Sequence, residues 1–288
     1  MKNGRYLVRH AYLNQWHPVS PKTFGQQAHS TPLIPILVSI LVSMVMSVTA
    51  LMAIALVALI ALYLNFTKDL PSTDKLAKTD LFQSTRIYDR NGDLLFELFD
   101  PHDGRRTLVS IDQVPELVKQ STIATEDPTF YSNQGIDVQA ILRALYQNWR
   151  YKSTISGAST ITQQVVKNYL VGDDPTIDRK IREALTAVEV NRRYTKDEIL
   201  TLYLNTNNYG NLSYGIGAAA RGYFNKDVSQ LDLAEASLLA GLPQSPAVYD
   251  PCQNPDGALE RQGIVLNLME KAGYIESDEA DSAARETA

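Results

Sequence analysis

The most distinct pattern along the chain is one long apolar run. From Leu33 to Leu64 the sequence has 32 residues, and none of them is Asp, Glu, Lys, Arg or His. As a helix rising about 1.5 Å per residue, the run reaches roughly 48 Å, whereas the hydrocarbon layer of a bilayer is roughly 30 Å thick. The pattern therefore predicts a transmembrane helix, with a tilted span of about 20–25 residues inside the run.

The residues before the run predict its orientation. The run begins too late, and is about twice too long, for the apolar part of a cleaved signal peptide, so residues 33–64 are expected to be an uncleaved signal anchor. Four basic residues and no acidic residue precede it: Lys2, Arg5, Arg9 and Lys22. By the positive-inside rule, we expect a single-pass protein of the cell membrane. Residues 1–32 then form a cytoplasmic tail, and the remainder lies on the outer, periplasmic or extracellular, face.

The polar and apolar pattern changes again beyond the span. Residues 65–109 are expected to form a stalk and a short β-hairpin, because apolar and polar residues alternate around Asn91-Gly92, a pair favoured in type I′ turns. From Ser110 the apolar spacing becomes helical, which predicts a mainly α domain over residues 110–275. Three capping-box patterns mark expected helix starts: Ser110–Gln113, Thr195–Glu198 and Asp232–Glu235. The acidic residues 276–288 predict a frayed tail or the start of a linker.

Composition limits the chemistry available beyond the span. Cys252 is the single cysteine, so no intrachain disulfide can form, and of the four histidines only His102 follows the span. With one histidine and one cysteine there, neither a zinc cluster nor a Cys–His dyad is expected, so carboxylates must carry any acid–base chemistry. All 32 acidic residues follow the span, but only 23 of the 27 basic ones do. That balance argues against nucleic acid as a partner.

Two segments of the helical domain carry clustered polar groups. The segment from Glu126 to Asp137 places acidic residues near a turn and an aromatic ring. An adjacent acidic pair such as Glu126-Asp127 also commonly caps or solubilises a helix end. The segment from Gly157 to Asn168 puts hydroxyls, amides and a cation on one stripe if it is helical. Such a stripe is equally typical of a wet helix face, but its groups also suit a sugar or a phosphate.

A third segment pairs bases with a carboxylate. Arg179 and Glu183 are four residues apart and share one helix face, whereas Glu189 faces elsewhere and is expected to pair with Arg193. A structural salt bridge would explain the first pair. The same residues also match a site that holds a pyrophosphate and performs proton transfer.

In this order the segments resemble the glycosyltransferase family 51 domain, the peptidoglycan glycosyltransferase of class A penicillin-binding proteins and of monofunctional transglycosylases. The similarity runs from about Arg86 to Ile275. Its motifs are E-D-x-x-F at 126–130, G-x-S-T-I-T-Q-Q-x-x-K-N at 157–168, R-K-x-x-E at 179–183, K-x-E-I-L-x-x-Y-L-N at 196–205 and L-A-E-A…A-G-L-P-Q-S-P at 233–246. The resemblance implies a mainly α, lysozyme-like domain with a short β-hairpin, preceded by one transmembrane helix.

The resemblance also implies an inverting enzyme that polymerises lipid II into β-1,4 glycan strands and releases undecaprenyl pyrophosphate. Glu126 would be the general base, and Glu183 would lie at the pyrophosphate beside Lys167, Arg179 and Lys180. A divalent cation, Mg²⁺ or Mn²⁺, is compatible with that role, but neither a cofactor nor a metal ligand is certain. The implied substrate-binding residues are Asp127, Phe130, Asn133, Thr160, Gln163, Gln164, Lys167, Asn168, Arg179 and Lys180.

Two departures from the family pattern keep other interpretations open. Many members have His at the position of Asn133, and relatives often have an aromatic residue at that of Asn208. One alternative is a non-catalytic, lipid II-binding scaffold of the cell-wall machinery, and another is a glycan-cleaving hydrolase. The expected partners are lipid II, lipid-linked glycan, the membrane and other cell-wall synthesis proteins, but no nucleic acid. The sequence leaves open a complete monofunctional enzyme or the front part of a bifunctional class A protein, and the hairpin at 86–95 with the acidic end favours the second.

Overall fold

The computed structural model describes residues 7–9, 16–18, 33–68, 70–78, 81–92, 94–100, 104–151 and 158–287. The chain divides into two compact units, Met1–Ala61 and Leu62–Ala288. In the first unit, β1 (Leu7–Arg9) pairs antiparallel with β2 (Trp16–Pro18), within the segment expected to be a tail. His102 and Gly157 lie outside the described residues.

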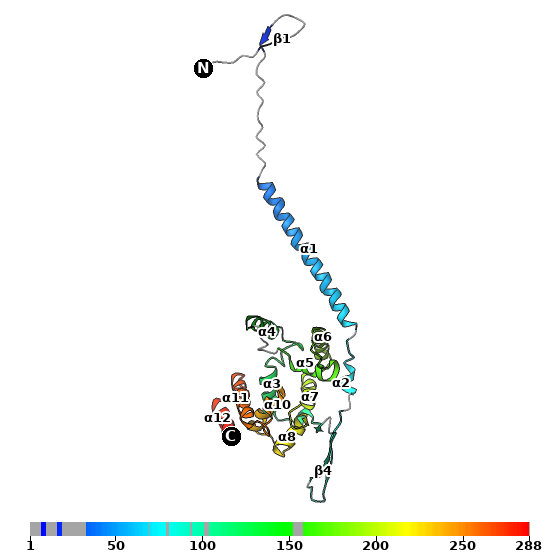
Figure 1. Ribbon diagram of the computed structural model, residues 1–288, viewed down its shortest axis with the longest axis vertical. Helices are drawn as coiled ribbons and strands as arrows, with labels where there is room; N and C mark the ends of the chain where they lie inside the picture. Colours follow the sequence, from blue (N-terminus) through cyan, green and yellow to red (C-terminus); the bar gives the residue numbers. More distant parts are fainter. Residues whose placement is uncertain are drawn as a thin grey trace. The chain divides into compact units, whose positions relative to one another are not determined.

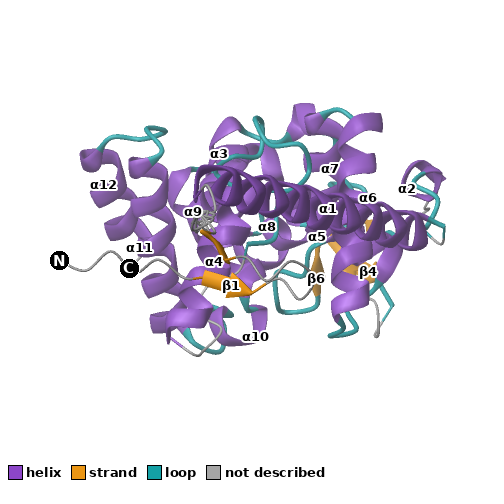
Figure 2. Ribbon diagram, turned by 90° about the horizontal axis from the view of Figure 1, so that it is seen from above, coloured by secondary structure: helices purple, strands orange, loops and turns teal. Residues whose placement is uncertain are grey.

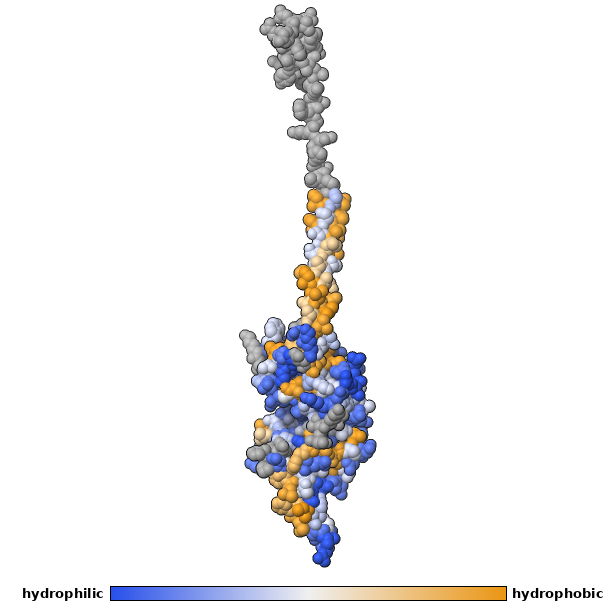
Figure 3. All heavy atoms as spheres, turned by 90° about the vertical axis from the view of Figure 1, so that its right-hand side faces the viewer, coloured by the Kyte–Doolittle hydropathy of each residue, from blue (hydrophilic) through white to orange (hydrophobic). Residues whose placement is uncertain are grey.

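The apolar run forms one helix, α1 (Leu33–Thr67), as predicted (Figure 1). Hydrophobic residues mixed with weakly polar ones cover the visible face of this helix (Figure 3). Three of its hydroxyls are satisfied within the helix, because Ser39, Ser47 and Thr49 each donate to a backbone carbonyl three or four residues earlier. By length and composition α1 can cross a membrane, and it is the one such helix among the described residues.

Helices make up most of the second unit, and its strands are short (Figure 2). The mainly α fold with one β-hairpin is therefore confirmed. The helices are α2 (Asp74–Lys78), α3 (Glu116–Glu126), α4 (Val138–Tyr151), α5 (Ile161–Val166), α6 (Ile177–Arg193), α7 (Lys196–Thr206), α8 (Ile216–Phe224), α9 (Leu233–Gly241), α10 (Pro246–Tyr249), α11 (Pro255–Lys271) and α12 (Ser277–Thr287). The strands are β3 (Thr85–Tyr88), β4 (Leu94–Leu98), β5 (Arg105–Arg106) and β6 (Ser213–Tyr214).

Two hydrophobic clusters hold these helices together. In the larger cluster, α5 lies between α6 and α7, and its Ile161, Val165 and Val166 are fully buried. The smaller cluster joins α3, α9, α11 and α12 around Val265 and Met269. Because α5 is apolar on its buried side, it is fixed by packing and its polar side chains can point to a shared site.

The predicted hairpin exists, but its turn differs from the prediction. β3 and β4 pair antiparallel. A type I′ turn needs positive φ at both Asn91 and Gly92, and only Gly92 has it, at 92°. The Asp89 carboxylate accepts from the Asn91 backbone N–H at 2.7 Å, and the Gly92 N–H donates to the Asp89 carbonyl. The Asp89 side chain therefore stabilises a longer turn, and the type I′ prediction is wrong.

The expected helix starts are largely confirmed. Thr195 and Asp232 cap α7 and α9 in capping boxes. Ser110 instead opens a single 3₁₀ turn, Ile111–Gln113, and α3 begins only after Pro115. The proline explains this delay, because it disfavours helical backbone at the residue before it.

The frayed-tail prediction for residues 276–288 is wrong over most of its length. Ser277–Thr287 form α12, and Ala280 and Ala283 are buried against the smaller cluster. The stalk is also partly packed, because Leu76 of α2 belongs to the larger cluster. Small apolar side chains three residues apart give α12 a face that packs on α11, although its overall composition is acidic.

Replacement of Gly135 by Ala tests how tightly this fold encloses the turn before α4. Gly135 has φ of 93°, and a Cβ there would overlap the Ala187 carbonyl of α6. Gly92 has φ of 92° with nothing within 4 Å of a Cβ, so Gly92→Ala is a matched control. We expect Gly92→Ala to lose about 1–2 kcal/mol of stability and Gly135→Ala more than about 3 kcal/mol. Thermal unfolding of the detergent-solubilised chain measures both, and equal losses would contradict the close packing.

Candidate active site

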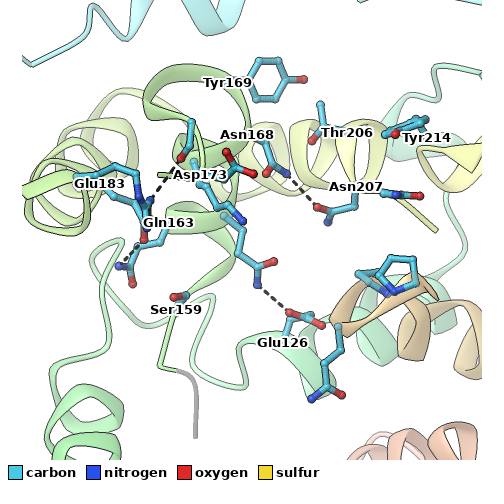
Figure 4. Close-up of a pocket in the computed structure, with 18 of the residues that line it drawn as sticks. Glu126, Ser159, Gln163, Asn168, Tyr169, Asp173, Glu183, Thr206, Asn207 and Tyr214 are labelled. Atoms are coloured by element: carbon cyan, nitrogen blue, oxygen red, sulfur yellow. Dashed lines mark hydrogen bonds and ion pairs between the residues drawn. The ribbon is translucent and has the colours of Figure 1, made fainter. Parts of the chain in front are cut away.

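A cleft of about 1140 Å³ opens between α3, α5, α6 and the segments after α7 and α9 (Figure 4). Eight of the twelve residues expected at the site line it: Glu126, Gln163, Gln164, Lys167, Asn168, Arg179, Lys180 and Glu183. Asn208 lines it too. Carboxylates, amides and cations thus meet in one hollow, although they come from segments far apart in the sequence.

Glu126 lies at the last residue of α3 and has one side-chain partner within the described part of the chain. Its Oε2 accepts from Gln164 Nε2 of α5 at 2.7 Å, which leaves Oε1 for another ligand. Burial raises the pKa of Glu126, and the neighbouring charge of Asp127 raises it further, while the Gln164 hydrogen bond and the charge of Arg261 oppose the shift. A carboxylate with a raised pKa is a stronger base, so Glu126 is suited to accept a proton.

Glu183 has the opposite environment. Its side chain is 1% exposed, and three donors surround it. Arg179 Nη1 lies 2.6 Å from Oε2, Gln163 Nε2 lies 3.1 Å from Oε1, and Lys180 Nζ also contacts Oε1. Because both oxygens are occupied, Glu183 holds the two cations in place and is poorly placed to transfer a proton.

The cations of the cleft differ in how far they are neutralised. Arg179 contacts the backbone carbonyls of Gly172 and Asp174 as well as Glu183, and Lys180 also donates to Ser159 Oγ at 2.6 Å. Among the described residues, Lys167 has no ion-pair partner, and it lines the cleft. An unpaired ammonium next to two positioned cations favours an anionic ligand.

Lys167 and its neighbours lie on an unusual backbone. Residues Lys167–Val171 form a π-helical turn that continues α5 and ends at Gly172, where φ is 73°. The Gly172 N–H donates to the Lys167 carbonyl at 3.0 Å, which closes the wide turn. The turn brings Lys167, Asn168 and Tyr169 to the cleft, and π turns inserted in helices often mark functional sites.

Four expected substrate-binding residues lie beneath the cleft wall and do not line it: Asp127, Phe130, Asn133 and Thr160. The Thr160 hydroxyl is buried, donates to the Gly135 carbonyl at 2.6 Å and caps α5 by accepting from Gln163 N. Burial raises the pKa of Asp127, whose carboxylate accepts from the backbone N–H of Ile161 at 3.2 Å. Through these hydrogen bonds, Thr160 and Asp127 hold the N-terminal end of α5 in place.

The cleft also contains residues that the sequence reasoning did not single out: Leu81, Arg106, Ser159, Tyr169, Gly172, Asp173, Pro175, Thr206, Asn207, Tyr214, Pro243, Gln244 and Pro246. Figure 4 labels several of them, and Asn207 Oδ1 accepts from Asn168 Nδ2 at 3.1 Å. Ser159 lies inside a recognised motif and Tyr169 directly follows it, so both could have been included for that reason. Arg106 reaches the cleft only through the tertiary fold, so no local pattern points to it.

A divalent cation has no evident ligand set among the described residues. No three His, Cys, Asp or Glu side chains gather there in a way that could hold a metal ion. Glu183, which could have served as a ligand, is already surrounded by donors. The described residues therefore offer no preformed set of three such ligands for the cation that the family resemblance leaves open.

The domain is helical, and its cleft combines a carboxylate with a raised pKa, several amides and an ammonium that has no ion-pair partner among the described residues. This combination is typical of the class of proteins that bind polar, anionic substrates and transfer protons. Residues 91–270 match the family described as Transglycosylase, and the chain belongs to that family. It is 44% identical over 218 residues to "Penicillin-binding protein 1A/1B" of Bacillus subtilis, covering 75% of this chain and 23% of that protein.

Two further matches are also penicillin-binding proteins. The chain is 40% identical over 222 residues to "Penicillin-binding protein 1A" of Rickettsia bellii, covering 76% of this chain and 28% of the relative. A crystal structure of Penicillin-Binding Protein 1A from Haemophilus influenzae aligns with 26% identity and a TM-score of 0.42, covering 72% of this chain and 21% of that one. The chain thus spans about a quarter of the length of these curated relatives.

The contrast between the two glutamates predicts opposite effects on stability. Because the pKa of Glu126 is raised by folding, its ionised form opposes folding, and its contribution worsens as pH rises through that pKa. We expect Glu126→Gln to raise Tm at pH 7, with the gain disappearing near about pH 4, where the wild-type side chain is protonated. Glu183→Gln leaves two cations without their anion and is expected to lose on the order of 2 kcal/mol. Thermal unfolding against pH would contradict this account if both variants moved Tm in the same direction.

Proposed function

We propose that the chain is a membrane-anchored peptidoglycan glycosyltransferase that polymerises lipid II into β-1,4 glycan strands. The observation that carries the proposal is the arrangement of one cleft, in which Glu126 keeps a free carboxylate oxygen and Lys167 adds an unpaired charge beside Arg179 and Lys180. One side of the cleft can accept a proton, and the other can neutralise a pyrophosphate.

The reaction uses these groups in one displacement. Glu126 removes the proton from the 4-hydroxyl of the acceptor sugar, whose oxygen attacks the anomeric carbon of the lipid-linked donor from the opposite face. The bond from that carbon to the pyrophosphate oxygen breaks, and the leaving oxygen keeps the electron pair. Lys167, Arg179 and Lys180 stabilise the charge on undecaprenyl pyrophosphate, while Glu183 keeps the last two in position.

The two alternative functions, a glycan hydrolase and a non-catalytic scaffold, explain fewer of the residues at the site. A hydrolase that cleaves a neutral glycosidic bond has no anionic leaving group, so the cluster of Lys167, Arg179 and Lys180 would have no use in its cleft. A scaffold without turnover would follow if Asn133 left its position without function. However, Asn133 is fully engaged, because it donates to Asp127 and accepts from Lys196.

The surface of α4 supports a lipid-linked substrate. This helix carries Arg143 and Arg150 and no acidic residue, and its large apolar side chains face outward. Trp149 is 77% exposed, and Leu142 and Leu145 are exposed to a similar extent. A basic helix with an exposed apolar face is typical of segments that lie in a membrane interface.

The activity assay uses lipid II with the detergent-solubilised full chain. Glu126→Gln is expected to lower polymerisation by about 10²- to 10⁴-fold, because an amide cannot accept the hydroxyl proton. Glu116→Gln is the matched control: Glu116 begins the same helix, is exposed and lies away from the cleft lining. Binding of lipid II without polymer by the wild type would support the scaffold, and cleavage of glycan strands would support the hydrolase.

The membrane contact of α4 can be measured through Trp149. The sequence has two tryptophans, so Trp16→Phe leaves Trp149 as the only indole. In proteoliposomes that contain brominated lipid, we expect quenching of Trp149 fluorescence and a blue-shifted emission, because the indole enters the interface. Leu145→Ser in the same background removes a neighbouring apolar anchor and should weaken the quenching. Emission typical of water, quenched by acrylamide and not by brominated lipid, would refute the contact.

A further inference from the structure

Lys196 occupies a position that local helix energetics disfavour. It is the first residue of α7, where the partial positive charge of the helix N-terminus favours acidic residues. The next two residues, Asp197 and Glu198, follow that preference. The stabilisation of Lys196 must therefore come from elsewhere in the fold.

The partner of Lys196 is the turn that follows Glu126. Lys196 Nζ donates to the Asn133 backbone carbonyl at 3.0 Å and to Asn133 Oδ1 at 3.2 Å. It also lies 4.7 Å from the centre of the Phe130 ring, in cation–π geometry. The ammonium is thus held by three acceptors that all belong to one turn.

Asn133 connects this cation to a buried anion. Its Nδ2 donates to both carboxylate oxygens of Asp127, at 3.0 and 2.9 Å, while its Oδ1 faces Lys196. The carboxamide dipole therefore lies with its negative end toward the ammonium and its positive end toward the carboxylate. A neutral side chain in this orientation links the two charges without a direct ion pair.

Asp127 in turn fixes the start of α5. Its Oδ2 accepts from the Ile161 N–H at 3.2 Å, and α5 carries Gln164, which donates to Glu126. Asp127 is also the immediate neighbour of Glu126 in the chain. A displacement of its carboxylate would thus reach Glu126 by two routes, through the backbone and through α5.

We infer that Lys196 is a positioning residue of the glycosyl transfer, which acts through Asn133 and Asp127 to hold α5 and Glu126 in register. The inference rests on the proposed function. Lys196 does not line the cleft, so it holds the base without contacting substrate. In this chain it supplies the positive charge that the neutral Asn133 lacks.

The test compares initial rates of lipid II polymerisation by the full chain. Lys196→Met keeps the aliphatic stem over Phe130 and removes the charge, and we expect kcat to fall by about 10- to 100-fold with little change in KM. Lys226→Met is the matched control, because Lys226 is likewise a lysine held near a helix start, in its case by ion pairs with Asp232 and Glu235, and it lies outside the cleft lining. Its kcat should equal that of the wild type.

Rescue separates positioning from general structural damage. Lys196→Arg restores a cation and should recover most of the lost kcat. Asn133→His in the Lys196→Met background should also recover activity at mildly acidic pH, because an imidazolium can donate directly to Asp127. Lys196→Gln, which can donate a hydrogen bond but carries no charge, is measured alongside and replaces Lys196→Met if that variant fails to fold.

The outcomes are distinct. Full kcat in the charge-removing variant while Glu126→Gln is inactive would overturn the inference and leave the proposed function intact. A loss that neither Lys196→Arg nor Asn133→His relieves would also overturn it. If the wild type makes no polymer, the proposed function fails and the inference fails with it.

Discussion

The buried carboxylate of Glu183 fixes the two helices that carry most of the cleft. Removing a carboxylate from water is unfavourable by several kcal/mol in real proteins, on the order of 5, unless donors replace the lost water. The donors come from both elements, Gln163 from α5 and Arg179 and Lys180 from α6. Arg179 and Lys180 lie on the same helix as Glu183, so of these three contacts only the Gln163 hydrogen bond joins α5 to α6. Sliding of α5 along α6 would remove this donor from the buried charge. The requirement to satisfy one anion therefore keeps two cations at fixed positions on the cleft wall.

Glu126 and Glu183 show how the same side chain acquires two properties from its surroundings. Glu183 has three donors and no free oxygen, so its charge is used entirely within the protein. Glu126 has one donor, and burial raises its pKa. Such a separation of environments is how paired carboxylates divide their roles in acid–base sites. The cleft thus combines a charge network around Glu183 that is satisfied within the protein with one carboxylate, Glu126, that keeps an oxygen without a donor among the described residues.

The sequence predicted the features that depend on neighbours along the chain. The apolar run, the caps of α7 and α9 and the pair of Arg193 with Glu189 follow from spacings of three to four residues or from composition. The predictions that failed depend on distant partners or on backbone angles. The alanines of α12 become core only because α11 covers them, and the turn after β3 follows an Asp89 side-chain hydrogen bond.

The candidate site shows the same difference between features set by neighbours along the chain and features set by distant segments. Motif residues of α5 and α6 could be assigned to the cleft in advance, whereas Arg106 lies outside the recognised motifs and reaches the cleft only through the fold. Thr160 and Asp127 were expected at the substrate, yet their side chains point back into the fold. A motif shows which residues act together, but a hydroxyl or carboxylate in it can equally serve the backbone that presents the motif. Only the three-dimensional arrangement separates these two uses.

α5 and the π turn that continues it together present five residues to the cleft, yet this segment has little stability of its own. α5 has only six residues, too few for an isolated helix, and it continues into a π turn that ends at Gly172 with positive φ. Its conformation therefore depends on buried contacts at its start, where Thr160 caps it and Asp127 accepts from Ile161. Because these contacts come from the turn after Glu126, the base and the opposing amides and cations cannot be repositioned independently. This coupling explains why residues remote from the cleft surface belong to its chemistry.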